Sequence, residues 1–99
     1  MGLKSTTNCL GYQQITDVSA STALTVPAVN GQGNKCQPTM ALIVAEAQGV
    51  RWRDDGTAPS ATVGMPLAVG VPLNYDGDLT KIRFFEQVAG AKLNVSYYA

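Results

Sequence analysis

The sequence predicts a small all-β fold, a β-sandwich of jelly-roll type with about eight short strands, and three observations support it. Apolar residues recur at the spacing of two that a strand imposes, most clearly over residues 92–98. Ten glycines and five prolines divide the chain into short segments. β-Branched and aromatic residues fill those segments without the spacing of an amphipathic helix. We expect two packed sheets, because this many strands do not stay in one open sheet at this size.

Two segments define the expected sheets best. Residues 40–45 are apolar on both faces, which is typical of a central strand, and residues 92–98 alternate cleanly. The short connections 47–49 and 89–91 predict two hairpins, one joining 40–45 to 50–53 and one joining 82–88 to 92–98. The full set of expected strands is 12–18, 23–26, 40–45, 50–53, 65–69, 71–75, 82–88 and 92–98.

The length of the chain limits the number of domains, and its charge limits the kinds of molecule that it binds. A chain of 99 residues fits one domain, 1–99, in which residues 1–11 form a possible N-terminal arm. The seven basic and seven acidic residues give no net charge, which argues against a nucleic-acid partner. We expect no membrane span and no signal peptide, and therefore synthesis in a cytoplasm. The charged fraction of 14% is low and favours a protein packed against neighbours, as in a homo-oligomer.

Little in the sequence indicates catalysis. Histidine, the commonest general base, is absent, and neither familiar glycine-rich phosphate loop occurs. Two cysteines without histidine cannot complete a zinc site, so we expect Cys9 and Cys36 to be reduced thiols, with a disulfide as the alternative. The sequence thus predicts no enzyme activity, no catalytic or cofactor-binding residue and no metal ligand.

Four aspartates are the strongest candidates for a metal or acid–base site. Asp54 and Asp55 precede Gly56, and Asp76 and Asp78 flank a glycine. Paired carboxylates bind calcium or act as acid and base. The same residues are common in tight turns, and no glutamate follows at the spacing of an EF-hand. We therefore interpret them as turn residues.

Adjacent aromatic residues predict a contact surface. Phe84 and Phe85 are neighbours on one expected strand and so face opposite sides of its sheet, as do Tyr97 and Tyr98 on the next. A hairpin of these strands is apolar on both sides. The second side needs a cover, either the N-terminal segment or another subunit, and large aromatic residues favour interfaces.

Arg51 and Arg53 flank Trp52 and are followed at once by Asp54 and Asp55. An ion-paired strand face is the simple interpretation, and the alternative is that both arginines bind carboxylates of a partner chain. Trp52 is expected in the core rather than as a stacking platform. The interface candidates are Phe84, Phe85, Tyr97, Tyr98, Arg51, Arg53 and Trp52.

The stretch VRWRDDGTAPSATVGMPL at 50–67, continued by Asp78 and Leu79 and closed by GAKLNVSYY at 90–98, resembles small virion proteins of tailed bacteriophages. The resemblance implies a short β-sandwich in the virion that coats or braces the capsid as a decoration or cement protein, or sits at the head and tail. Its partner would be the major capsid protein or another virion protein, and no catalytic residues transfer. The alternatives are a glycan- or receptor-binding module of a phage tail or fibre, using Trp52 or the tyrosines, and a minimal metal enzyme using the aspartates.

Overall fold

A computed structural model describes residues 9–30 and 32–99, which form eight β-strands. These residues contain no helix, and thus no helix long and apolar enough to cross a membrane. The prediction of an all-β fold with about eight strands is confirmed. The strands are β1 (Cys9–Ile15), β2 (Thr22–Ala23), β3 (Met40–Glu46), β4 (Val50–Arg53), β5 (Met65–Leu67), β6 (Leu73–Tyr75), β7 (Arg83–Glu86) and β8 (Lys92–Tyr98).

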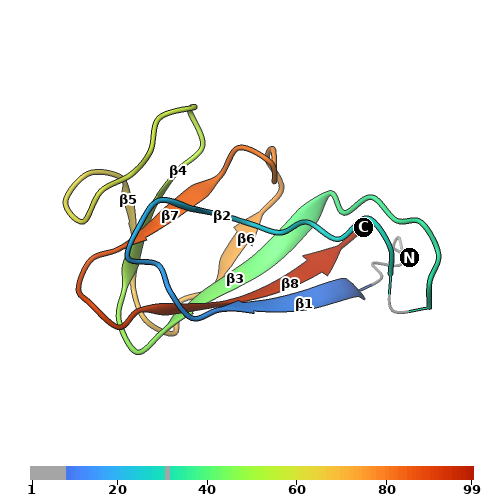
Figure 1. Ribbon diagram of the computed structural model, residues 1–99, viewed down its shortest axis with the longest axis horizontal. Coiled ribbons are helices and arrows are strands. Elements are labelled where there is room, and N and C mark those ends of the chain that lie inside the picture. The colour runs from blue at the N-terminus through green and yellow to red at the C-terminus, as the bar shows by residue number, and fades with distance from the viewer. Residues whose placement is uncertain (1–8, 31) are drawn as a thin grey trace, which may run out of the picture.

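The strands form two four-stranded antiparallel sheets (Figure 1). Sheet I has the order β1-β8-β3-β6, and sheet II has the order β2-β7-β4-β5. Each strand pairs with its counterpart counted from the other end of the chain: β1 with β8, β2 with β7, β3 with β6 and β4 with β5. Two further pairings, β3 with β8 and β4 with β7, join these ribbons into the sheets.

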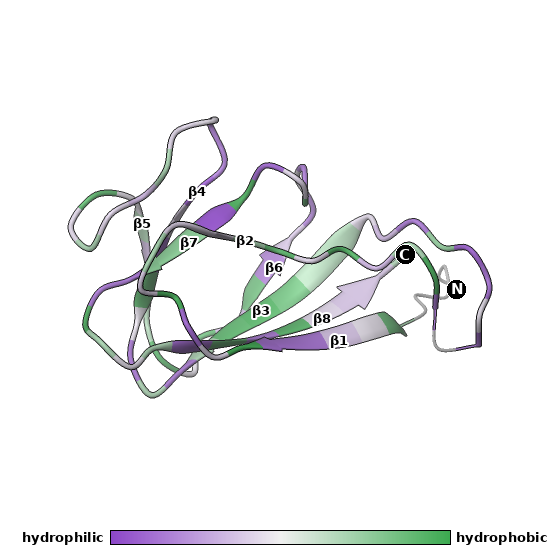
Figure 2. Cartoon of the chain, in the orientation of Figure 1, coloured by the Kyte–Doolittle hydropathy of each residue, from purple (hydrophilic) through white to green (hydrophobic). Residues whose placement is uncertain are grey.

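The core lies between the sheets and receives every second side chain of the central strands. In β8 the inward residues are Leu93, Val95 and Tyr97, all with at most 1% exposure, as the alternation predicts. β3 adds Ala41, Ile43 and Ala45, and Figure 2 shows β3 as hydrophobic along most of its length. Sheet II and its flanking connections supply most of the opposing layer, which includes Val18, Val50, Leu67, Ile82 and Phe84.

Both predicted hairpins are wrong. β3 lies in sheet I and β4 in sheet II, and β7 and β8 are divided between the sheets in the same way. The connections 47–49 and 87–91 therefore cross from one sheet to the other, and Gln87 N donates to Gly49 O at 3.0 Å to hold them together. Ala47 (φ 71°) and Gly90 (φ 101°) take the left-handed backbone conformation at these reversals. A short glycine-containing segment serves a crossing as well as a hairpin, so length alone does not distinguish them.

Other strand boundaries also differ from prediction. β1 begins at Cys9, so residues 9–11 of the predicted arm belong to a strand, and residues 1–8 lie outside the described part. The expected strand 71–75 starts only at Leu73, and Val71 belongs to the connection from β5, where it is half exposed. Only Thr22 and Ala23 form β2, and β7 ends at Glu86.

Candidate contact surfaces

The four aromatic residues expected on the two-faced hairpin lie on different sheets. Phe84 (0% exposed) and Tyr97 (1% exposed) point into the core, one from β7 and one from β8. Phe85 and Tyr98 point outward and are half-buried, on the outer faces of sheet II and sheet I. A single aromatic patch on paired strands therefore does not form. Phe85 and Tyr98 are the two that reach a surface.

Trp52 belongs to the inner side of sheet II, where its register partners are Phe84 on β7 and Met65 on β5. The indole packs against the core and is half-buried. Its ring meets Tyr75 of sheet I edge to face, with 5.9 Å between centroids. This placement agrees with the prediction of a core residue.

Arg51 and Arg53 share the outer side of β4 but differ in what they bind. Arg51 donates through Nε to Ala61 O at 3.2 Å and through Nη1 to Gly64 O at 2.9 Å. Both carbonyls belong to the long connection 54–64 between β4 and β5, so Arg51 fastens that connection to the sheet. Its guanidinium is largely committed within the chain.

Arg53 instead forms an ion pair with Asp55 on the surface, where the two side chains are 28% and 54% exposed. Arg53 Nε donates to Asp55 Oδ1 at 3.1 Å. The hydrogen bond between the side chains raises the pKa of Arg53 and lowers that of Asp55. The predicted ion-paired face is thus present, but only at this pair.

The outer face of sheet I carries apolar side chains from three adjacent strands. It is defined here by Tyr12 on β1, Met40, Leu42 and Val44 on β3, and Tyr98 on β8, which alternate with the inward residues of those strands. Met40 lies opposite Tyr98 in the register, and Leu42 and Tyr12 flank Ser96 on either side. Four of the five are half-buried, and Tyr12 is 64% exposed.

Polar side chains border Tyr12 on this face. Its hydroxyl donates to Asn94 Oδ1, which also accepts from Gln14 Nε2 at 3.2 Å. Asn94 Nδ2 in turn donates to Glu46 Oε1 at 2.9 Å. Sequence reasoning did not single out Tyr12. Its only signal was its place in an alternating segment that was expected to be a strand.

Two of the four aspartates, Asp55 and Asp78, accept hydrogen bonds within turns. Asp78 Oδ1 accepts from Thr80 N at 2.9 Å and from Thr80 Oγ1 at 2.6 Å, and these bonds lower the pKa of Asp78. Asp54 Oδ2 accepts from the Tyr75 hydroxyl at 2.7 Å, which ties the start of the 54–64 connection to sheet I. Within residues 9–30 and 32–99, no group of three or more His, Cys, Asp or Glu side chains is placed to hold a metal ion.

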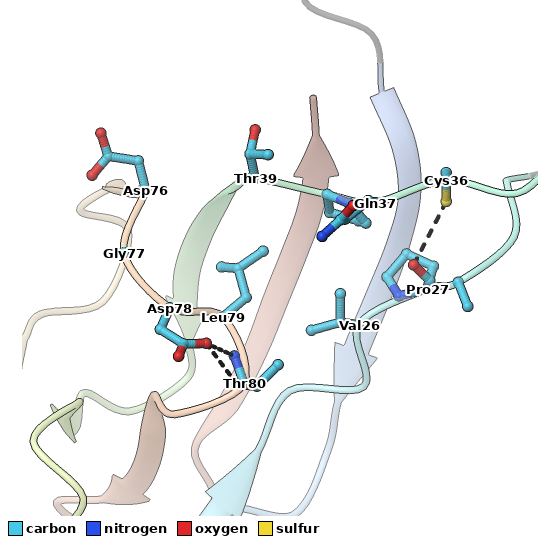
Figure 3. A pocket seen from close by; sticks show the side chains of 12 residues that line it. Val26, Pro27, Cys36, Gln37, Thr39, Asp76, Gly77, Asp78, Leu79 and Thr80 are labelled. Atoms are coloured by element: carbon cyan, nitrogen blue, oxygen red, sulfur yellow. Dashed lines mark hydrogen bonds between the residues drawn. The ribbon is translucent and has the colours of Figure 1, made fainter.

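A cavity of about 510 Å³ opens between the β2–β3 and β6–β7 connections (Figure 3). Val26, Pro27 and Leu79 form an apolar wall, and Thr39 and Asp76 supply polar groups. The Cys36 thiol also lines this cavity and donates to Pro27 O at 3.6 Å. Cys36 and Cys9 are both free thiols, as predicted.

A second cavity, of about 400 Å³, lies beside the ion pair. Arg53 and Asp55 line one part of it, and Val63 and Met65 line another. The two apolar residues are 53% and 56% exposed. Sheet II therefore also offers an apolar surface with a charged border, at the end that carries the 54–64 connection.

Comparison with protein-family models, with curated proteins and with solved structures finds no match for this chain.

Proposed function

We propose that the protein is a non-enzymatic structural protein of a tailed-phage particle, which binds the assembled capsid and stabilises it as a decoration or cement protein. The observation that carries the proposal is the outer face of sheet I. Its apolar side chains come from three adjacent strands, and charged side chains of those strands occur only at one end, at Glu46 and Lys92. A sheet face of this composition suits attachment to a protein lattice.

The area of the outer face of sheet I can be compared with the area that a specific interface needs. Three strands spaced by about 4.8 Å, each of seven residues at about 3.3 Å, give an area of roughly 330 Å². A specific interface needs about 800 Å² on each partner. The sheet face alone is therefore too small, and exposed apolar residues of the connections, such as Val69 and Val71 between β5 and β6, would have to contribute. Repetition over many lattice sites adds avidity to a weak single contact.

The strand pairing supports the finer proposal that the sandwich is a jelly roll. When β1 pairs with β8, β2 with β7, β3 with β6 and β4 with β5, the chain has the form of one long hairpin rolled up on itself. Jelly rolls are frequent among viral capsid and lectin domains. This likeness concerns architecture, and function depends on the surfaces.

A glycan- or receptor-binding module of a phage tail or fibre is the second candidate, and Tyr12 is the observation that favours it. An aromatic ring that is 64% exposed and bordered by Asn94, Gln14 and Glu46 combines a stacking surface with amide and carboxylate groups. Sugar rings stack on aromatic faces while such groups bind their hydroxyls. On this hypothesis the outer face of sheet I binds a saccharide instead of a capsid subunit.

The experiment begins with phage particles that lack the protein, to which the purified protein is added back. Wild type is expected to sediment with intact particles and to raise the temperature at which they release DNA. A ligand that binds only the assembled state stabilises each site by about 2.7 kcal/mol at a hundredfold excess over its dissociation constant. Absence of the protein from native particles, or no binding on add-back, would reject the proposal.

Two variants of matched exposure locate the contact. Tyr12→Lys places a charge on the outer face of sheet I, and Val88→Lys does so on the connection between β7 and β8, where Val88 is 59% exposed. We expect Tyr12→Lys to weaken particle binding at least about tenfold, or about 1.4 kcal/mol, and Val88→Lys to leave it unchanged. Saturable binding of a host glycan that Tyr12→Lys abolishes, with no binding to particles, would favour the second candidate.

A further inference from the structure

A small cavity of about 210 Å³ lies where three segments of the chain meet on sheet II. Ser21 directly precedes β2, Arg83 begins β7 and Lys81 lies two residues before it, and Gly56, Thr57 and Ala58 belong to the connection between β4 and β5. These segments are far apart in sequence, and neither basic residue was singled out by sequence reasoning. The cavity brings two cations and two hydroxyl groups together.

The positive charge at this cavity is not balanced by ion pairs among the described residues. Arg83 lies directly opposite Arg53 in the β4–β7 register, an arrangement of like charges that is unfavourable unless it is offset. The carboxylate of Asp55 balances the positive charge of Arg53 through their ion pair. Arg83 and Lys81 make no ion pair with any residue in 9–30 or 32–99. Hydrogen bonds from Thr80 and, to a smaller degree, the charge of Lys81 lower the pKa of Asp78, but that carboxylate is bound to Thr80.

The orientation of Arg83 is fixed from within the chain. Its Nη1 donates to Thr80 O at 2.9 Å and to Ile82 O at 3.1 Å. Its Nε and Nη2 have no hydrogen-bond acceptor among the described residues. That edge of a guanidinium binds an oxyanion through two parallel hydrogen bonds. Because these two bonds already hold the Arg83 side chain in place, it loses little conformational freedom when it binds an anion.

The other donors at the cavity favour one class of anion over another. Lys81 adds a compact charge, and the hydroxyls of Ser21 and Thr57 donate to no other described residue. A planar carboxylate is satisfied by the two bonds of one guanidinium, whereas a tetrahedral oxyanion has further oxygens for additional donors. The volume accommodates such an ion with several waters, each of which takes about 30 Å³ in the liquid.

We propose that this cavity is a binding site for a phosphate group, in which the Nε and Nη2 edge of Arg83 binds two oxygens while Lys81 and the hydroxyls of Ser21 and Thr57 bind the others. The group is either inorganic phosphate or the terminal group of a phosphate monoester. The site is separate from the outer face of sheet I, and the proposal is independent of attachment to a particle.

The test titrates the full-length protein with inorganic phosphate and, separately, with a simple phosphate monoester, at constant ionic strength maintained with chloride. We expect a saturable rise of Tm by several degrees and saturable shifts of the backbone amide resonances of Ser21, Gly56 and Thr57. Saturable binding of either ligand supports the site, and the tighter ligand identifies the source of the phosphate group. An equal response to acetate would overturn the assignment to phosphate.

Variants then test the two cations. Lys81→Gln and Arg83→Gln are each expected to weaken phosphate binding about tenfold or more, which corresponds to about 1.4 kcal/mol. Lys35→Gln, which removes one positive charge from the exposed part of the β2–β3 connection, is the matched control and should bind as wild type does. Equal weakening in all three variants would mean a diffuse charge effect and would refute the site. The amide shifts of the wild-type protein decide the question even if Arg83→Gln fails to fold.

Discussion

Trp52 of sheet II and Tyr75 of sheet I meet edge to face across the sandwich, with ring planes at 68° to each other. Tyr75 also donates its hydroxyl to Asp54 Oδ2, only two residues beyond Trp52. One tyrosine thus connects the two sheets by an aromatic contact and a hydrogen bond. The pair lies where β4 leads into the connection 54–64, so it fixes the sheets together at the base of that connection.

A double-mutant cycle is expected to measure this contact. Trp52→Leu and Tyr75→Leu should each lower the free energy of unfolding. The double variant should lose about 0.5–1.5 kcal/mol less than the sum of the two single losses, and this difference is the coupling energy of the contact. The measurement is the free energy of unfolding in urea. Trp52→Leu combined with Tyr98→Leu, on the outer face of sheet I, is the control, for which we expect additivity within about 0.5 kcal/mol. Equal coupling in both cycles would contradict a specific aromatic contact.

Stability is expected to fall in alkaline solution between about pH 10 and about pH 12. Burial raises the pKa of Tyr97 to about 12, and burial together with the hydrogen bond to Asp54 raises that of Tyr75 to about 12. The unfolded chain loses these protons near pH 10 while the folded protein retains them. This contribution is present below pH 10 and is lost as pH rises through 12.

Urea midpoints measured across that range test the expectation. The double variant Tyr75→Phe with Tyr97→Phe has no such phenols to titrate, and its stability should fall less steeply with pH. An identical slope in wild type and the double variant would show that other groups dominate the alkaline transition.

Substitution of the two arginines of β4 is expected to change the stability of the fold by different amounts. Arg51→Gln removes two bonds from a charged donor to Ala61 O and Gly64 O, and we expect a loss of about 1.5–3 kcal/mol. Hydrogen exchange at Val63 and Gly64 should become faster as the connection loosens. Arg53→Gln removes an exposed ion pair that water and salt screen, so it should cost much less than Arg51→Gln, and its small effect should disappear at high salt. Equal losses for the two variants would disprove the assignment of Arg51 as the fastening residue.

Gly64 is expected to tolerate substitution less well than Gly56. Both have positive φ, 140° and 89°, so alanine at either position is strained by about 1–2 kcal/mol. A Cβ at Gly64 would also approach Arg51 Cβ, Trp52 O and Pro59 Cβ within 3.0–3.3 Å, whereas nothing lies within 4 Å of one at Gly56. Gly64→Ala should therefore lower Tm further than Gly56→Ala. Thermal unfolding followed by circular dichroism compares the two variants, and equal losses would argue against close packing at Gly64.

Sequence reasoning predicted which residues face the core better than it predicted which strands are neighbours. The alternation of Leu93, Val95 and Tyr97 depends only on local geometry, and the structure confirms it. Pairing depends on the whole chain. β8 lies between β1 and β3, and nothing local to residues 87–91 distinguishes a hairpin from a crossing.

The surfaces were predictable only in part for the same reason. The separation of Phe84 from Phe85 and of Tyr97 from Tyr98 on opposite faces followed from strand geometry. The outer face of sheet I and the cavity at Arg83 required the fold, because each gathers residues from segments that lie far apart in sequence.

The internal position of β8 has a consequence for how the chain acquires its structure during synthesis. Residues 92–98 form β8, which lies between β1 and β3 in sheet I. Neither β1 nor β3 can therefore pair with β8 until residues 92–98 have left the ribosome. Stable structure therefore forms after translation of this segment, and the long sequence separations of its contacts place the folding rate with the slower all-β proteins, in the millisecond-to-second range. Nascent chains interrupted before residue 92 should remain open to proteolysis, whereas those that expose residue 98 should become resistant.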